Sequence, residues 1–371
     1  MDNKRNPENL FNIRNSFYLC NNCINRQNIA VFNYSNKRSK KCFVCNNLFI
    51  KVNTIIEKII WYITKKEIYE FNSFLIGSSL PSVMFENEDY LRSLLKIKGR
   101  ENIKSEFNRI LRERFEQLMK KKLEIKIPDL FINIIVKENC DFDFSVRSSN
   151  FYLLCRYVKK RMLLQKNKIC QNCKGKKCEL CKFIRNNNAK SIENIARKKF
   201  LSYTNSDNVI FQWTGNEDIN SQVLGKGRPF VAQIINPRKR IFSNFKVFGN
   251  GVTIFVDKCT ANKELQTKFK IKSRLYLETL KKINCVDVDK INQLSEKIIE
   301  YNYNSTFAYK KIYTISAKII DTNTLIIEMI SDNGISYKQF IEGESLIEPN
   351  ISSCIKNKCK CIKFDILDVI I

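Results

Sequence analysis

Two pairs of cysteines near the N-terminus constrain the fold of this chain more than any other feature. Cys20 and Cys23 form one Cys-x-x-Cys turn, and Cys42 and Cys45 form a second, with 18 residues between the pairs. Each turn presents two sulfurs to one ion, and two turns complete a tetrahedron without water. The pattern therefore predicts a structural zinc site; reduced thiols without metal are the alternative.

A second set of four cysteines lies in the middle of the chain, at Cys170, Cys173, Cys178 and Cys181. Its short spacing predicts a compact second zinc site, with unliganded cysteines as the alternative. The chain has 15 cysteines and no histidine, which excludes histidine ligands and Ser-His or Cys-His catalysis. Cysteines used for metal, and an N-terminus without an apolar signal core, predict an intracellular, reducing compartment, either cytoplasm or nucleus.

The charge of the chain indicates a polyanionic partner. Its 65 Lys and Arg residues against 37 Asp and Glu give a formal net charge of +28. Without an apolar run long enough to span a membrane, this excess favours nucleic acid. A compositional drift toward Lys, Asn and Ile is the alternative. We expect no membrane association and no obligate protein partner.

The hydrophobic periodicity predicts an α+β fold, because helical and alternating patterns follow each other along the chain. The expected elements are helices over residues 54–73 and 101–121, a helix beginning at 191, and strands over 74–81, 128–136, 141–146, 230–235, 311–320 and 325–330. The last two strands are expected to form a hairpin.

A polar stretch around Asp218 has the composition of an active-site loop. Residues 216–230 place Glu217 and Asp218 in a turn that contains Gly225 and Gly227, and an apolar strand follows. Glycine allows backbone conformations that other residues resist. Asp218 is therefore expected on a loop held by a sheet. An aspartate that only forms the turn is the alternative.

This stretch resembles the signature loop of the archaeal and eukaryotic tRNA pseudouridine synthases that modify the T arm. The family pattern is approximately Gly-Arg-Glu-Asp-Val-Asp-x-Arg-x-Leu-Gly-x-Gly-Arg-Pro-Phe. It is matched here by Gly215, Glu217, Asp218, Leu224, Gly225, Gly227, Arg228, Pro229 and Phe230. Asn216, Asn220 and Gln222 depart from it. The resemblance implies that Asp218 is the catalytic aspartate.

Residues 335–344 resemble the last motif of the same family. Lys338 matches the basic residue that pairs with the catalytic aspartate, whereas Ser336 stands where tyrosine is expected. The resemblance therefore implies a catalytic pair of Asp218 and Lys338. A cation beside the carboxylate would hold it ionised in a partly dry site.

The resemblance also implies contacts with the substrate. Tyr276, in residues 273–280, would pack against the target base, with a core tyrosine as the alternative. Residues 335–341, expected as a strand, would cover the base. The full set of expected substrate contacts is Tyr276, Arg228, Ile341, Arg238, Arg240, Arg156 and Lys159. For residues around Arg156 and Lys159, a solvated basic helix is the alternative.

We therefore expect two domains. A zinc-ribbon and THUMP-like RNA-binding domain covers residues 1–165, and a pseudouridine synthase domain with a mixed, mainly antiparallel sheet covers residues 166–371. The expected reaction converts uridine to pseudouridine in the T loop of tRNA, at position 54, 55 or both. It needs two structural Zn2+ ions and no catalytic cofactor. The alternative, favoured by Asn216, Gln222 and Ser336, is a degenerate zinc protein that binds tRNA without reacting.

Overall fold

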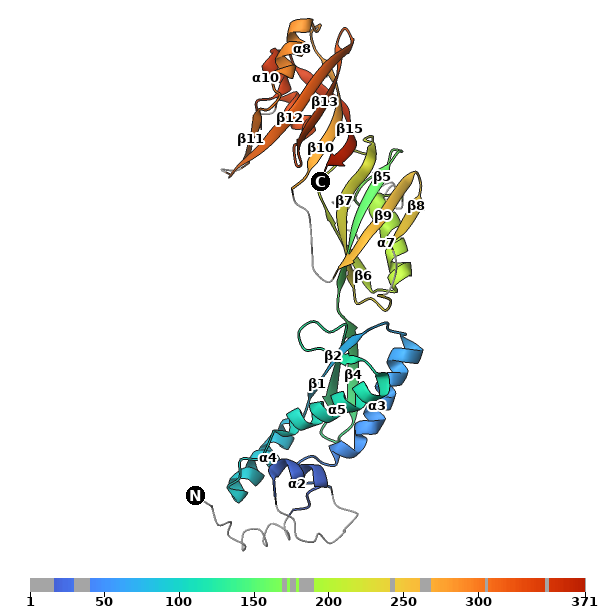
Figure 1. Ribbon diagram of the computed structural model, residues 1–371, viewed down its shortest axis with the longest axis vertical. Helices are drawn as coiled ribbons and strands as arrows, with labels where there is room; N and C mark the ends of the chain where they lie inside the picture. Colours follow the sequence, from blue (N-terminus) through green and yellow to red (C-terminus); the bar gives the residue numbers. More distant parts are fainter. Residues whose placement is uncertain are drawn as a thin grey trace. The chain divides into compact units, whose positions relative to one another are not determined.

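The chain forms two compact units (Figure 1). The structure is a computed structural model that describes residues 17–29, 41–168, 172–173, 178–179, 190–240, 244–260, 268–303, 306–343 and 347–370. The N-terminal unit comprises Met1–Ser149 and Asn236–Ile241, and the C-terminal unit comprises Asn150–Ile235 and Phe242–Ile371. The chain passes from the N-terminal to the C-terminal unit after Ser149, which is earlier than the expected boundary at residue 165. The reason is that residues 151–159 belong to the sheet of the C-terminal unit.

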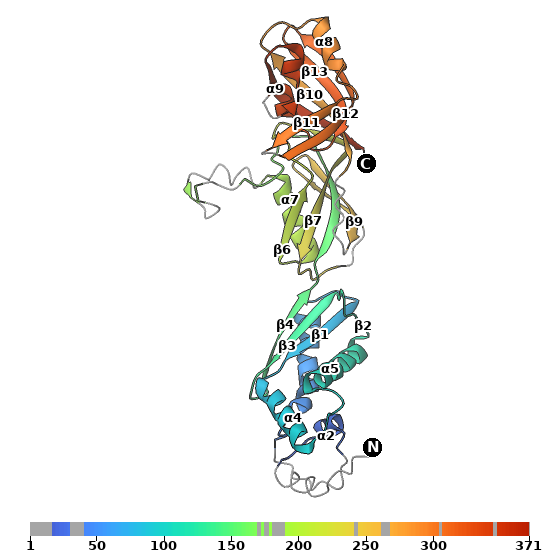
Figure 2. The ribbon, with the colours of Figure 1, turned by 90° about the vertical axis from the view of Figure 1, so that its left-hand side faces the viewer.

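The N-terminal unit packs helices against a four-stranded sheet with the order β2-β1-β3-β4. The strands are β1 (Ser73–Ser79), β2 (Lys122–Leu123), β3 (Leu130–Val136) and β4 (Phe142–Ser148), and the α-helices are α2 (Asn21–Gln27), α3 (Val52–Trp61), α4 (Ser82–Leu95) and α5 (Ile103–Met119). Strand β1 runs parallel to β2 and β3, whereas β4 is antiparallel to β3 (Figure 2).

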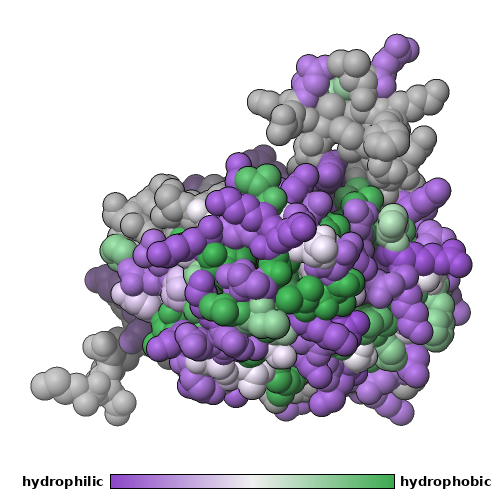
Figure 3. All heavy atoms as spheres, turned by 90° about the horizontal axis from the view of Figure 1, so that it is seen from above, coloured by the Kyte–Doolittle hydropathy of each residue, from purple (hydrophilic) through white to green (hydrophobic). Residues whose placement is uncertain are grey.

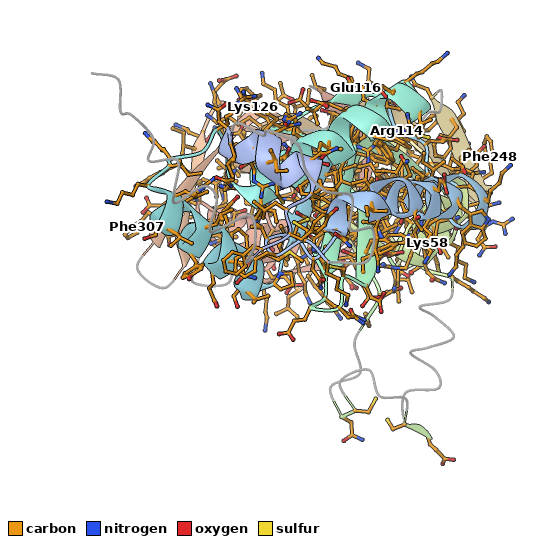
Figure 4. The ribbon with its side chains drawn as sticks, turned by 90° about the horizontal axis from the view of Figure 1, so that it is seen from below. Lys58, Arg114, Glu116, Lys126, Phe248 and Phe307 are labelled. Atoms are coloured by element: carbon orange, nitrogen blue, oxygen red, sulfur yellow. The ribbon has the colours of Figure 1, made fainter. Side chains whose placement is uncertain are left out.

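Helical spacing of apolar residues explains how α3 and α5 cover this sheet. On α3, Ile55, Ile56 and Ile59 are fully buried, whereas Lys58 is exposed. On α5, Phe115 packs against Phe74 of β1 with ring centroids 4.6 Å apart. Charged side chains of both helices, including Lys58, Arg114 and Glu116, are exposed and are labelled in Figure 4. The predicted helices and strands of this unit are present, with α3 ending at Trp61 and continuing as a π-helical turn to Lys66.

The C-terminal unit is built on one large sheet with the order β14-β11-β12-β13-β10-β15-β7-β5-β9-β8, and β6 also pairs with β7. Its strands are β5 (Phe151–Lys159), β6 (Asn208–Trp213), β7 (Val223–Ile235), β8 (Phe245–Gly249), β9 (Val252–Thr260), β10 (Lys270–Thr279), β11 (Ile298–Tyr303), β12 (Thr306–Asp321), β13 (Thr324–Asp332), β14 (Ile347–Glu348) and β15 (Cys359–Ile370). Its helices are α7 (Ile192–Thr204), α8 (Cys285–Asn292), α9 (Tyr337–Glu342) and α10 (Ile351–Ile355).

Two halves of this sheet meet where β15 joins β7. The pairs within each half are antiparallel, and β15 and β7 are parallel at the single register pair Ile366 and Val223. Helix α7 packs beside β6 and β8, and α9 packs on β15 (Figures 1 and 2). The predicted α+β class with a mixed, mainly antiparallel sheet is confirmed. No helix in the described part of the chain is long and apolar enough to cross a membrane.

Three local predictions are corrected by this sheet. Gly225 and Gly227 lie inside β7 instead of a turn, with φ of 57° and 82°. A Cβ on Gly227 would lie 2.7 Å from the carbonyl oxygen of Tyr157, so glycine allows β5 to approach closely. Residues 335–341 contain helix α9 instead of a strand. Residues 151–159 form a strand, so the basic-helix alternative fails.

Exposed apolar side chains gather at the end of the C-terminal unit that carries α8. Leu280, Val286 and Ile320 are 72%, 58% and 55% exposed. The backbone N–H of Ile283 donates to the carbonyl oxygen of Thr322, which joins the segment before α8 to the β12–β13 turn. Figure 3, which looks onto this end, shows apolar side chains bordered by charged and polar ones.

Candidate active site

The loop between β6 and β7 turns one carboxylate inward and the next outward. Asp218 is exposed, and in the described part of the chain its carboxylate forms no ion pair. The side chain of Glu217 is fully buried, with its carboxylate 2.9 Å from Lys159 Nζ and 3.6 Å from Arg228 Nη1. It also accepts a hydrogen bond of 2.7 Å from Tyr157 Oη. Burial, followed by the Glu217 charge, raises the pKa of Tyr157, which keeps this phenol protonated as a donor.

Lys159 and Arg228 fix the backbone of this loop. Lys159 Nζ donates to the carbonyl oxygens of Leu163 at 3.0 Å and Asp218 at 3.1 Å. Arg228 donates from Nη1 to the carbonyl oxygen of Asn216 at 3.0 Å and from Nη2 to that of Thr214 at 3.2 Å. Two buried cations therefore hold the chain on both sides of Asp218.

The buried position of these two cations corrects the expectation that they lie on an RNA-facing surface. Lys159 is 0% exposed and Arg228 is 4% exposed. Lys159 is buried because β5 turns alternate residues inward, and the inward set runs from Phe151 through Tyr157 to Lys159. Ile341 is also fully buried, in the core beneath α9, and does not line an open surface.

The charges of Asp218 and Lys338 both influence the pKa of one half-buried thiol, that of Cys361. Burial raises the pKa of Cys361, on β15, to about 11; the charges of Asp218 and Glu342 raise it further and that of Lys338 lowers it. The backbone N–H of Cys361 donates to Glu342 Oε1 at 3.2 Å. Lys338 and Glu342 are one helical turn apart on α9, and Lys338 is exposed. Helix α9 packs on β15, and Gln222, at the end of the Asp218 loop, is hydrogen-bonded to Asp365 and Ile366 of the same strand.

Tyr276 is half-buried on β10 and is linked to the same loop through two charged residues of β15. Lys363 Nζ lies 4.4 Å from the centre of the Tyr276 ring. Lys363 also pairs with Asp365 at 3.3 Å, and Asp365 Oδ1 accepts from the backbone N–H of Gln222 at 2.9 Å. No local pattern in the sequence marks Lys363 or Asp365, because their partners are distant along the chain.

The three other expected RNA contacts are all in ion pairs. Arg156 pairs with Asp257 at 2.7 Å. Arg238 and Arg240 belong to the N-terminal unit, where they pair with Glu67 at 3.2 Å and with Asp129 at 3.4 Å. These carboxylates offset part of the positive charge that sequence analysis assigned to RNA. Contact with RNA by these arginines stays a prediction.

The four N-terminal cysteines form a group that could hold a metal ion. All four Sγ atoms lie within 4.8 Å of one another, with Cys20 and Cys45 at 3.5 Å and Cys23 and Cys42 at 3.6 Å. Tetrahedral zinc with Zn–S bonds of about 2.3 Å needs sulfurs about 3.8 Å apart, so the group fits zinc. Hydrogen bonds from neighbouring thiols, that of Cys20 first, lower the pKa of Cys42 and favour a thiolate there.

A buried arginine connects this cysteine group to the helices of the N-terminal unit. Arg26 Nη2 donates to Cys23 Sγ at 3.4 Å, and the same guanidinium pairs with Glu88 at 2.7 Å and with Glu106. Burial acts to lower its pKa, yet the charges of Cys23 and the two glutamates hold it above its usual value. The arginine therefore stays charged beside the sulfurs. The second cysteine set cannot be placed in the same way, because Cys170 and Cys181 lie outside the described residues.

Comparisons with known proteins match most of the chain. The model for "Pus10, C-terminal" matches residues 152–370, and that for "Pus10 THUMP domain, archaeal" matches residues 62–134. A tRNA pseudouridine synthase Pus10 of Nitrosopumilus maritimus is 29% identical over 90% of this chain and 87% of its own length. That of Methanosphaera stadtmanae is 24% identical over 89% of each chain. A chain of a Cbf5-Nop10-Gar1 complex is 8% identical with a TM-score of 0.30, over 46% of this chain and 43% of that one, which is too low to carry an argument.

Proposed function

The chain belongs to the Pus10 family and is a tRNA pseudouridine synthase, an isomerase, and from this premise we propose that it modifies the T loop of tRNA with Asp218 as its catalytic carboxylate. The target is position 54, position 55 or both. The observation that carries the assignment of Asp218 is its exposure on a loop whose backbone is held by buried Lys159 and Arg228. Such a loop presents a charged group in a fixed place.

The reaction breaks the bond between C1′ of the ribose and N1 of uracil, turns the base and joins C1′ to C5. The hydrogen on C5 leaves as a proton, and N1 gains one, so no oxidant or cofactor is consumed. An ionised carboxylate can begin this by attacking the base or ribose, or by removing a sugar proton. We assign exposed Lys338, on helix α9, as the basic residue that accompanies Asp218 in the reaction.

A target uridine inside folded RNA must leave its stack to reach Asp218. Tyr276 supports this step, because its half-buried ring is connected to the loop through Lys363 and Asp365. We assign Tyr276 to packing against the flipped base. We also assign one zinc ion to the four N-terminal cysteines and a second to Cys170, Cys173, Cys178 and Cys181, both structural.

The test is pseudouridine formation on an unmodified tRNA transcript, with enzyme in excess and the product mapped by a base-specific chemical probe. Asp218→Asn keeps the volume and removes the charge, so turnover should become undetectable while tRNA affinity stays near that of the parent. Asp321→Asn, at the exposed β12–β13 turn, is the matched control and should react normally. Reaction of Asp218→Asn at the parent rate would show that this loop is not the catalytic centre.

One observation favours the alternative of a tRNA-binding protein that does not react. Asn216, which replaces an arginine of the family pattern, is held by Lys166 Nζ at 2.7 Å, so its side chain is engaged within the protein. Under this alternative the parent binds tRNA tightly and forms no pseudouridine with any T-loop substrate. The same assay, run beside a binding measurement, separates the two functions.

A further inference from the structure

A cavity of about 570 Å³ lies in the C-terminal unit, where β10 begins and β13 and β15 end. Lys268, Lys270 and Lys310 line it together with Tyr309, Tyr313 and Asp332. Lys270 is the register partner of Asp332 on β13 and of Ile370 on β15, so these three residues share one face of the sheet. The cavity is therefore a feature of the sheet surface itself.

Positive charge predominates in this cavity, which is lined by three lysines and one carboxylate. Among the described residues, Lys268, Lys270 and Lys310 form no ion pair. The single carboxylate, Asp332, is already engaged, because it accepts from Tyr313 Oη at 3.0 Å and from the backbone N–H of Lys311 at 2.8 Å. Three ammonium groups against one carboxylate leave the cavity an excess of positive charge for an anionic ligand.

Aromatic rings accompany these lysines. Tyr309 is 62% exposed, and Phe307, on the same face of β12, is 56% exposed and labelled in Figure 4. Lys270 Nζ lies 3.8 Å from the centre of the Tyr313 ring, which holds this ammonium at the cavity wall. Exposed aromatic faces beside unpaired cations are the surface on which unpaired bases stack while their phosphates are neutralised.

The same face of β10 connects the cavity to Tyr276. Lys270, Lys272, Arg274 and Tyr276 alternate on this strand, and the residues between them are buried. Six residues of strand span about 20 Å, which corresponds to about six steps along one strand of a nucleic-acid duplex. Arg274 is paired with Glu328 at 2.6 Å, so Lys270 and Lys272 are the cations that lead along β10 from the cavity toward the ring that we assign to the target base.

From these observations, and resting on the proposed function, we infer that the Lys268–Lys270–Lys310–Tyr309 cavity is a second binding site for the substrate tRNA. It takes the phosphodiester backbone on its lysines and an unpaired base on Tyr309, about six nucleotides from the target uridine. Recognition at this distance fixes the register of the RNA on the sheet, because phosphate contacts position the nucleic acid relative to the site of chemistry.

The experiment measures tRNA affinity directly, at several salt concentrations, with full-length protein. Tyr309→Ala should weaken binding by about fivefold to 100-fold, because base stacking is lost, and Tyr309→Phe should restore it because the ring is kept. The double variant Lys270→Ala/Lys310→Ala should reduce the slope of log Kd against log salt by about 1.4 to 1.8. Lys282→Ala, an exposed lysine outside the cavity, is the control and should leave affinity near the parent value.

Parent-like affinity and salt slope in the alanine variants would overturn the inference, and so would equal weakening by Lys282→Ala. Thermal unfolding of each variant excludes loss of fold as the cause, and Tyr309→Phe provides a second check at the same position. Because binding is measured without turnover, this result is separate from the proposed function. That function fails if the parent forms no pseudouridine, whatever these variants do.

Discussion

Glu217 is the only carboxylate found, among the described residues, between the buried side chains of Lys159 and Arg228. Glu217→Gln keeps the shape of the side chain and its ability to accept from Tyr157, but it removes the negative charge. Both cations then stay buried without a counter-charge. We therefore expect this neutral substitution to be among the most damaging in the C-terminal unit.

The magnitude follows from the loss of one partner of a buried ion pair, which costs about 3–5 kcal/mol. Because two cations depend on Glu217, its loss should lie at the upper end, about 5 kcal/mol, or roughly 10–20 °C in Tm for a unit of this size. Lys159→Met should cost less, about 3 kcal/mol, because Arg228 remains 3.6 Å from the carboxylate. We therefore also predict that Glu217→Gln is less stable than Lys159→Met.

Thermal unfolding gives the stability, and single-turnover kinetics, measured well below the unfolding range, give the rate. Lys159→Met should also slow the reaction, because the carbonyl of Asp218 loses its 3.1 Å hydrogen bond and the loop loses a fixed position. Glu278→Gln, at an exposed position of β10, is the matched control and should change stability by less than about 0.5 kcal/mol. If Glu217→Gln unfolds at the parent temperature, or less readily than Lys159→Met, the buried network does not hold this loop.

Three further predictions concern metal, salt and pH. Native mass spectrometry should find two zinc ions per chain, and Cys23→Ser should remove one; a single ion in the reduced parent would contradict one of the two sites. Affinity for tRNA should fall at least roughly tenfold between low and physiological salt, whereas a flat response would mean that the +28 charge does not serve RNA binding. Because burial raises the pKa of Cys361 to about 11, its neutral thiol should stabilise the fold below about pH 9, and this contribution should be lost as the pH rises toward 11. Alkylation of Cys361 should follow the same profile, and Asp218→Asn should move it to lower pH; an identical profile in the parent and in Asp218→Asn would refute this.

Local patterns in the sequence predicted most elements, because apolar spacing reports directly which face of a helix or strand is buried. The same rule also accounts for two features that were not predicted, helix α9 and the burial of Lys159. Tyr337, Phe340 and Ile341 have helical spacing and Gly343 follows as a left-handed C-cap, which are the signals of α9. Alternating apolar residues from Phe151 to Tyr157 continue inward to Lys159, so its burial was predictable from the period of a strand.

The arrangement of the site could not be predicted from such patterns. Asp218 and Lys338 are far apart in the sequence, and the two halves of the sheet that carry them are joined through β15 and β7 at one register pair. No local periodicity encodes a contact of that kind, and only the resemblance to a family connected the two residues. Lys363 and Asp365 show the same limit, because their roles arise from cross-strand neighbours.

The segment Asn236–Ile241 affects how this chain could be divided or exchanged. It leaves the C-terminal unit after β7, belongs to the N-terminal unit and returns before β8. A fragment ending at Ser149 would therefore leave Glu67 without Arg238, and the backbone N–H of Ser148 without the Asn236 side chain that accepts from it at 2.8 Å. Recombination between relatives at a single crossover would separate these partners. Swapping the N-terminal unit requires two exchanges, so the two units are expected to be inherited together.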